Sequence, residues 1–151
     1  MKKQVAILST AFIATIFVLS SCQNDDNLVL KSKTQLITQG SWKFDKATSG
    51  TPATDVSASI AACYKDNVVS FTSSTNGTVS DGVPCATPAP ANFTWSFQSG
   101  ETILSFDAAL FPGGGNNFSL VALTENSLVI SQDVIVPPSP TPVNVVFYYK
   151  H

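Results

Sequence analysis

Between Gly40 and Lys150 the sequence consists of short segments in which apolar and polar residues alternate. The clearest is the segment 93–98, which reads FTWSFQ. A period of two places successive side chains on opposite faces of a strand, whereas an amphipathic helix needs a period of about 3.6. Thr, Ser, Val and Phe, which suit strands, dominate the composition. The chain is therefore predicted to be all-β, without a long helix.

Eight strands are predicted, at 42–45, 68–72, 78–80, 93–98, 102–106, 118–123, 128–132 and 143–150. Tight turns are predicted at Asn76-Gly77, Ser99-Gly100 and Glu125-Asn126. Consecutive strands joined by short turns favour a meander, and eight strands suffice to close an up-and-down antiparallel β-barrel. Closure also removes the exposed edges that invite aggregation.

The remaining connections are long, and they alternate along the chain with the tight turns. They cover 48–62, 82–91, 107–116 and 133–142. Alternate connections of a meander lie at the same end of a barrel, so the long loops are expected at one mouth. Loops on a rigid scaffold often carry binding residues. A site is therefore predicted at this mouth, around Phe111, Asn116, Asn117 and the segment Pro137–Pro142.

The amino-terminal segment has the pattern of an export signal. Lys2 and Lys3 precede the uncharged apolar run 5–19, which is shorter than the roughly 20 residues that a spanning helix needs. The run ends in Leu19-Ser20-Ser21-Cys22, which resembles the lipobox of bacterial lipoproteins. The resemblance implies cleavage before Cys22 and a membrane anchor of fatty acyl chains, such as palmitate, on that residue.

These patterns divide the chain into three parts. They are a signal peptide at 1–21, a lipidated tether at 22–36 and a folded domain at 37–151. The tether begins Gln23-Asn24-Asp25-Asp26, which resembles the acidic signal that sends lipoproteins to the cell surface in one phylum of Gram-negative bacteria. The expected location is the outer membrane, with display on the cell surface. The alternative is that these residues are only a solvated linker.

Two cysteines remain in the domain, Cys63 and Cys85. An exported protein folds in an oxidising compartment, so a disulfide is expected between them. A metal site needs more ligands than the single His151 can add, and no metal or cofactor is expected. The chain has no arginine and a net charge of −2, so it has no basic stripe for nucleic acid.

The order of several short motifs resembles the lipocalin-like domains of small bacterial lipoproteins. Gly40-Ser41-Trp42 opens the first strand, Cys63, Asp66 and Phe71 follow, and Asn76-Gly77-Thr78, Cys85, Trp95, Leu123-Thr124 and Leu128-Val129-Ile130-Ser131 complete the match. The resemblance implies a lipocalin-like barrel over about residues 36–150. Lipocalins place an arginine over the tryptophan of the first strand. Here Lys150 is the candidate for that cation–π contact, and a solvated lysine is the alternative.

Enzyme chemistry is not expected. A Ser–His–Asp arrangement would have to use His151, which is expected to fray at the end of the sequence. Glu101 and Glu125 fall in turns and do not predict the facing carboxylates of a glycosidase. The run Gly113-Gly114-Gly115 lacks the following lysine of a phosphate loop.

Aromatic residues are the main indication of function. Those on expected inward faces are Trp42, Phe44, Phe71, Phe93, Trp95, Phe97, Phe106, Phe118, Phe147 and Tyr149. An eight-stranded barrel can either fill with side chains or hold one small ligand, and both alternatives stay open. The candidate ligand-binding residues are Trp42, Phe71, Trp95, Phe111, Asn116, Phe118 and Tyr149.

Two functions are compatible with this pattern. One is a membrane-anchored, monomeric binding module for a small apolar or amphipathic ligand. The other is a surface accessory or inhibitor-like module with a solid barrel and loops that bind protein or glycan.

Overall fold

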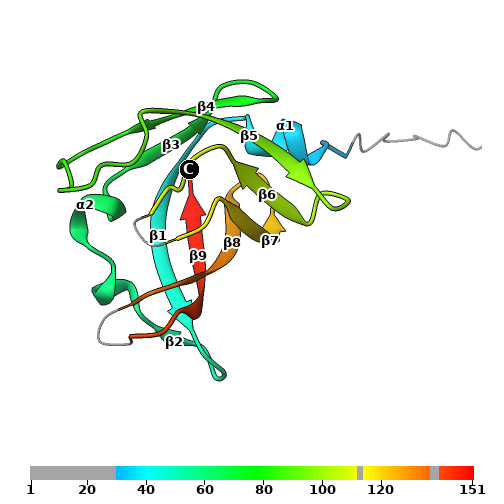
Figure 1. Cartoon of the computed structure of the whole chain (residues 1–151). Coiled ribbons are helices and arrows are strands. Elements are labelled where there is room, and N and C mark those ends of the chain that lie inside the picture. The colour runs from blue at the N-terminus through cyan, green and yellow to red at the C-terminus, as the bar shows by residue number, and fades with distance from the viewer. Residues whose placement is uncertain (1–29, 112–113, 137–139) are drawn as a thin grey trace, which may run out of the picture.

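The computed structural model describes residues 30–111, 114–136 and 140–151 (Figure 1). The predicted signal peptide, Cys22 and the acidic segment that follows it lie outside the described residues. So does part of the segment 137–142.

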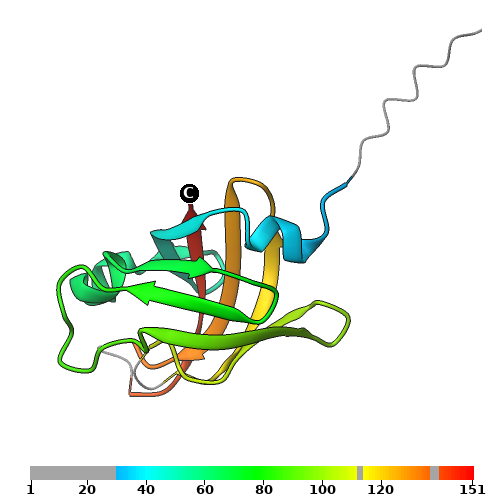
Figure 2. The same ribbon diagram turned by 90° about the horizontal axis from the view of Figure 1, so that it is seen from above.

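One antiparallel sheet closes on itself as a barrel (Figures 1 and 2). The strands pair in the order β2-β1-β3-β4-β5-β6-β7-β8-β9, and β9 pairs in turn with β1. Their bounds are β1 Ser41–Ser49, β2 Thr54–Asp55, β3 Val68–Phe71, β4 Asn76–Ser80, β5 Asn92–Gln98, β6 Ile103–Phe106, β7 Asn117–Leu123, β8 Ser127–Val134 and β9 Val143–Lys150. Because β2 is a two-residue strand paired only with the end of β1, the barrel itself has eight strands, as predicted.

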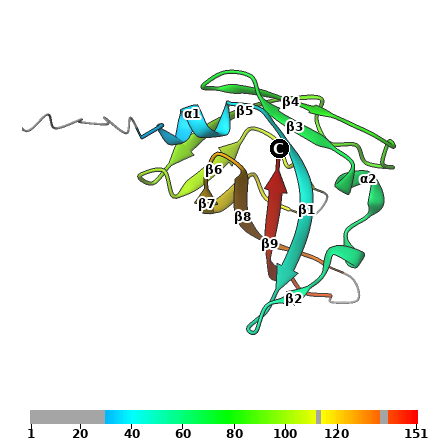
Figure 3. The same ribbon diagram turned by 180° about the vertical axis from the view of Figure 1, so that it is seen from behind.

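The part of the chain that the structure describes contains three short helical segments: α1 (Lys33–Ile37), η1 (Ser57–Ser59) and α2 (Ala62–Lys65). The last two belong to the long β1–β3 connection, which crosses one side of the barrel (Figure 3). Among the described residues, no helix is long and apolar enough to cross a membrane.

The predicted turn at Asn76-Gly77 is wrong, because both residues lie in β4. The hairpin turns at the preceding residues, where Ser73 Oγ accepts hydrogen bonds from the backbone of Thr75 and Asn76 at 3.3 and 3.0 Å. Gly77 is paired with Phe93, and a Cβ at Gly77 would overlap the Phe93 ring. Glycine is needed at position 77 because the Phe93 ring packs directly against its backbone. An Asn-Gly pair in the sequence does not show whether the glycine is needed for this contact or for a turn.

Helix α1 lies against the short-turn end of the barrel (Figure 2). It begins with a capping box, in which Ser32 Oγ accepts from Gln35 N and the Gln35 side chain accepts from Ser32 N. Lys33 Nζ donates to the carbonyl of Glu101 in the β5–β6 turn at 2.7 Å. Ile37 is fully buried. Residues just before the first strand thus pack against this end of the barrel.

The long β1–β3 and β4–β5 connections are joined to each other at the opposite end. The predicted disulfide Cys63–Cys85 is present, with its Cα atoms 5.3 Å apart. Tyr64 OH donates to Thr87 O at 2.6 Å, and Val83 N donates to Asp66 Oδ2 at 2.8 Å. Three separate contacts therefore fix the two loops together.

Of the two alternatives for Lys150, the cation–π contact with Trp42 is not formed. Lys150 forms an ion pair with Asp45 at 2.9 Å and does not lie over the indole. His151 lies there instead, with the ring centroids 3.9 Å apart, and His151 Nδ1 is 2.9 Å from the carbonyl of Ser41. The alternation of side chains along β9 explains why His151, and not Lys150, lies over the indole of Trp42. Tyr149 faces inward, Lys150 therefore faces outward, and the next residue can turn over the barrel end.

Candidate ligand site at the long-loop mouth

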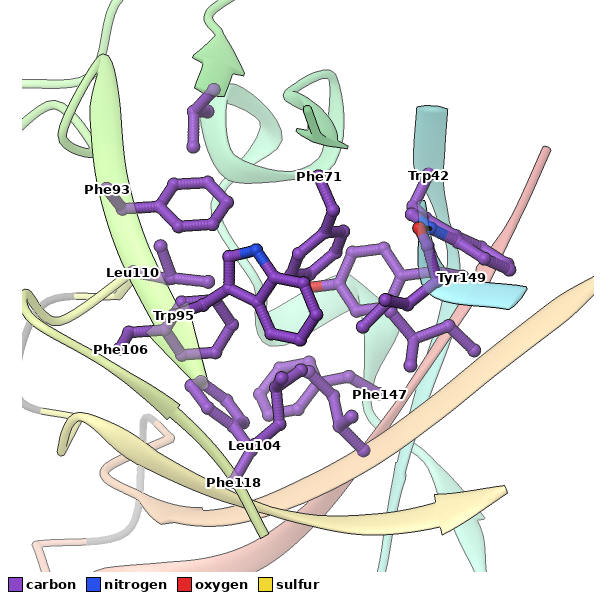
Figure 4. Packing of buried hydrophobic residues seen from close by; sticks show 14 of the residues in the cluster. Trp42, Phe71, Phe93, Trp95, Leu104, Phe106, Leu110, Phe118, Phe147 and Tyr149 are labelled. Atoms are coloured by element: carbon purple, nitrogen blue, oxygen red, sulfur yellow. Dashed lines mark hydrogen bonds between the residues drawn. The ribbon is translucent and has the colours of Figure 1, made fainter. Parts of the chain in front are cut away.

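The interior of the barrel is filled by aromatic side chains (Figure 4). Phe71 lies 5.6 Å from Phe93 and 5.0 Å from Trp95 between ring centroids, in edge-to-face contacts. Phe106 continues the cluster at 5.2 Å from Phe93 and 5.6 Å from Phe118. Such edge-to-face geometry suits aromatic packing and fills volume efficiently.

The space left between these rings is small. Two interior voids measure about 10 Å³ each, and one of them lies between Trp42, Phe71 and Tyr149. A void of that size holds one water molecule at most. Of the two alternatives left open by the sequence, the described residues therefore favour a filled barrel over a continuous interior cavity.

An apolar pocket of about 230 Å³ lies outside this filled core, at the mouth formed by the long loops. It is lined by Ser59, Ile60, Ala61, Tyr64, Phe111, Val134, Ile135, Val136 and Phe147. We refer to it as the mouth pocket. Its residues come from the β1–β3 connection, the β6–β7 loop and the end of β8, with Phe147 of β9 as part of its wall.

Phe111 is the central aromatic side chain of the mouth pocket. Its ring stacks on Phe147 at 4.9 Å with an interplanar angle of 10°, and it meets Tyr64 edge-on at 5.9 Å. Tyr64 is held by its neighbour Cys63 in the disulfide and by the bond of its hydroxyl to Thr87 O. Contacts with β9, with the β1–β3 connection and with the β4–β5 connection therefore hold the aromatic side chains of the pocket in place.

Charged side chains are absent from the described lining of the mouth pocket. The nearest cation in sequence, Lys65, donates to Ser57 O at 3.2 Å. A pocket without a charge does not stabilise an anionic or cationic group that loses its water on entry. The lining therefore suits an uncharged apolar group, with any polar part of the ligand left toward solvent.

The structure separates the residues that the sequence singled out for ligand binding. Trp42, Phe71, Trp95, Phe118 and Tyr149 belong to the buried core. Phe111 lines the mouth pocket, whereas Asn116 and Asn117 line a separate polar groove on the barrel surface.

Burial gives Tyr149 an unusual environment within that core. Its side chain is 6% exposed, and desolvation raises the pKa of its hydroxyl above the ordinary value of 10.0. The buried phenol therefore releases its proton only at a higher pH than an exposed tyrosine does.

Several lining residues of the mouth pocket were missed by the sequence analysis. Ile60, Ala61 and Tyr64 lie in a Ser- and Ala-rich connection without a periodic pattern, and their role depends on where the loop folds back. The run Val134–Val136 carried a usable signal, because three consecutive apolar residues precede a proline-rich loop. Ile135, in the middle of this run, is 50% exposed.

Metal chemistry has no support in the described part of the chain, where no cluster of three or more His, Cys, Asp or Glu residues could hold an ion.

Comparison with known proteins identifies one family. The family described as "Lipocalin-like domain" matches residues 38–130, from just before β1 to the middle of β8. No curated protein matches the sequence. The match covers most of the strands that form the barrel.

Proposed function

We propose, on the premise that this chain belongs to the lipocalin-like domain family, that it is a non-enzymatic binding module for a small apolar or amphipathic ligand. Lipocalin-like domains are typically non-enzymatic binding proteins. One observation carries the proposal: an uncharged pocket of about 230 Å³ lies at the long-loop mouth of a barrel whose interior is filled. The ligand site is therefore placed above the core and not within it.

The size of the pocket limits the ligand. Sites for drug-sized molecules measure roughly 300–1,000 Å³, so about 230 Å³ accepts a single ring system or a short aliphatic segment. Phe111 and Tyr64 provide aromatic faces, and Ile60 and Val136 provide aliphatic contact. Ser59 is a polar residue in the lining and can serve the head of an amphipathic ligand.

Membrane anchoring through lipid on Cys22 is part of the proposal, as is display at the cell surface directed by Asp25 and Asp26. The position of α1 supports this arrangement. It places the end of the tether at the short-turn end, through contacts of Lys31 and Lys33 with Glu125 and Glu101. A protein tethered there presents the mouth pocket away from the membrane.

A fluorescent probe tests the site directly. N-phenyl-1-naphthylamine is uncharged and gains fluorescence in apolar surroundings. It carries a naphthyl and a phenyl group, of which the pocket takes one ring system and leaves the other at its open side. We expect the mature protein to enhance its emission saturably, and a medium-chain alcohol to displace it.

Paired variants separate the pocket from the rest of the surface. Ala61→Phe places a ring in the mouth pocket, whereas Ala122→Phe makes the same change on the outside of β7; both alanines are exposed, so both variants should fold. We expect loss of probe binding only in Ala61→Phe. Equal binding by the two variants, or no saturable binding by the parent protein, would contradict the proposal.

A second function, a surface accessory or inhibitor-like module, is favoured by a different observation. The disulfide, the Tyr64–Thr87 bond and the Asp66–Val83 bond join two long loops into one fixed surface above a solid core. Such preorganised loops suit recognition of a protein. If Ala61→Phe leaves the protein's cellular role intact while disruption of the loop surface removes it, this second function is the correct one.

A further inference from the structure

We propose that a polar groove between β7 and β8 is a second binding site, which takes a neutral polyhydroxylated ligand of the saccharide class. The groove has a volume of about 410 Å³ and is open to solvent. It is lined by Ile103, Gly115, Asn116, Asn117, Phe118, Ser119, Ser131, Gln132, Asp133 and Asn144. It shares no lining residue with the mouth pocket, so the inference is independent of the function proposed above.

The groove exists because two neighbouring strands separate. Pairing between β7 and β8 ends at Ser119 and Ser131, so neither Phe118 and Gln132, which are next in register, nor Asn117 and Asp133 beyond them are paired with each other. Both strands continue to pair with their other neighbours: Asn117 with Ser105 of β6, and Asp133 with Asn144 of β9. The walls of the groove are therefore held in place by regular sheet on both sides.

Gln132 bridges the gap between the separated strands. Its Nε2 donates to Gly115 O and to Asn117 O, both at 2.8 Å. The side chain thus replaces part of the missing backbone ladder and keeps the groove at a fixed width. Gln132 is 8% exposed, and its Oε1 is buried without a hydrogen-bond partner among the described residues.

An unpaired buried acceptor is costly unless something satisfies it. The backbone beside Oε1 is Gly114, where a Cβ would lie 2.5 Å from that oxygen. A side chain at this position would have to displace the end of the Gln132 side chain. The unpaired acceptor therefore lies beside the loop backbone that continues into Gly115 at the groove.

The residues that line the groove indicate the chemical class of its ligand. Asparagine amides and serine hydroxyls can both donate and accept, and each hydroxyl of a sugar also does both. Among the described residues, no lysine lines the groove, which disfavours phosphate and carboxylate ligands. The apolar residues of the described lining are only Ile103 and the fully buried Phe118. Asp133 Oδ1 accepts from Asn144 Nδ2 at 2.9 Å, so one oxygen of the carboxylate in the lining is already engaged, and the other can accept from a ligand hydroxyl.

Chemical-shift mapping tests the inference on the mature protein. Maltose, cellobiose and lactose serve as neutral probes, each titrated separately into ¹⁵N-labelled protein. We expect at least one of them to cause saturable shifts at the backbone amides of Asn117, Ser119, Ser131 and Asp133. Residues of the mouth pocket, such as Tyr64, should not move, which separates this site from the one in the proposed function.

Matched variants then locate the hydrogen bonds. Asn117→Leu and Asn92→Leu are the same change at two exposed residues that each begin a strand, but only Asn117 lines the groove. Loss of the amide should weaken saccharide binding by about tenfold in Asn117→Leu and leave Asn92→Leu unchanged. Ser119→Val, which strands tolerate, gives a second disruption if Asn117→Leu does not fold.

Three results would overturn the inference. They are shifts with none of the three saccharides, shifts that map away from the groove, and equal affinity of the groove variants and Asn92→Leu.

Discussion

Replacement of Trp42 with phenylalanine tests how the short-turn end of the barrel is held together. Trp42 is fully buried, and its Nε1 donates to the carbonyl of Ile37 at 2.8 Å. That carbonyl belongs to the last residue of α1, which is itself fully buried. No other hydrogen bond to it is present among the described residues. Phenylalanine keeps most of the apolar ring but leaves this acceptor without a donor.

Trp95 provides the matched comparison. It is 4% exposed, and its Nε1 is shared between Ser73 O and Asn76 O, each at 3.2 Å. Asn76 O also accepts from the backbone of Thr72 at 2.9 Å, so it stays satisfied when the indole is removed. Both substitutions remove similar ring volume, whereas only Trp42→Phe strands a buried carbonyl.

The magnitudes follow from these contacts. A buried acceptor left unpaired costs about 1–3 kcal/mol, so Trp42→Phe should lose roughly that amount more than Trp95→Phe. Truncation to alanine at either position should cost about 3–5 kcal/mol, because it also leaves a large cavity. A domain of this kind has about 5–15 kcal/mol in total, so the alanine variants should express poorly.

Urea denaturation followed by far-ultraviolet circular dichroism measures these differences without relying on the fluorescence of the residue that is replaced. The free energy of unfolding should rank wild type above Trp95→Phe, and Trp95→Phe above Trp42→Phe. Equal losses in the two phenylalanine variants, or a larger loss in Trp95→Phe, would refute the role assigned to the Ile37 carbonyl. A fully stable Trp42→Ala protein would refute the structural importance of the first strand.

Three further predictions concern the anchor and the core. Cys22→Ala should leave the protein in the aqueous phase of a detergent partition, because no lipid can attach; recovery in the detergent phase would show that Cys22 is not the anchor. Replacement of Asp25 and Asp26 with alanine should protect the protein from protease added to intact cells, since surface display would fail; digestion equal to wild type would rule out the acidic signal. Burial raises the pKa of Tyr149 in the folded state above its ordinary value of 10.0, so the unfolded chain releases this proton first and stability should fall as pH rises beyond 10.0. Above pH 10.0, the free energy of unfolding of Tyr149→Phe should fall less steeply with pH than that of wild type, and Tyr148→Phe is the control. Parallel curves of unfolding free energy against pH for all three proteins would contradict this effect.

Local pattern predicted the eight barrel strands in their order, although β1 runs on to Ser49 and β4 begins at Asn76. The alternation in 93–98 and 143–150 identified β5 and β9 closely, because inward and outward faces follow directly from a period of two. The alternation of long and short connections also predicted which loops share an end, and the Cys63–Cys85 bond agrees with that arrangement. Closure of the sheet into a barrel was predicted because eight strands are enough to close one and because short turns join consecutive strands.

The candidate sites were determined only in part by the sequence. Phe111 and Asn116 were predicted at the long-loop mouth, yet they line two different sites, because they lie on opposite sides of the Gly-rich segment of one loop. The width of the polar groove depends on where β7 and β8 stop pairing, which is a property of two strands together and not of either sequence.

Tertiary packing decided the remaining questions. A strand pattern shows that Phe71, Trp95 and Phe106 face inward, but whether they leave a cavity depends on how rings from separate strands interlock. Asn76-Gly77 has the sequence of a turn, but Gly77 lies in β4 and the Phe93 ring packs against it. This contact arises because β5 pairs with β4 and places Phe93 opposite Gly77. Alternation is local and therefore readable from sequence, whereas volume, register and the partner of Trp42 are set by residues far apart in the chain.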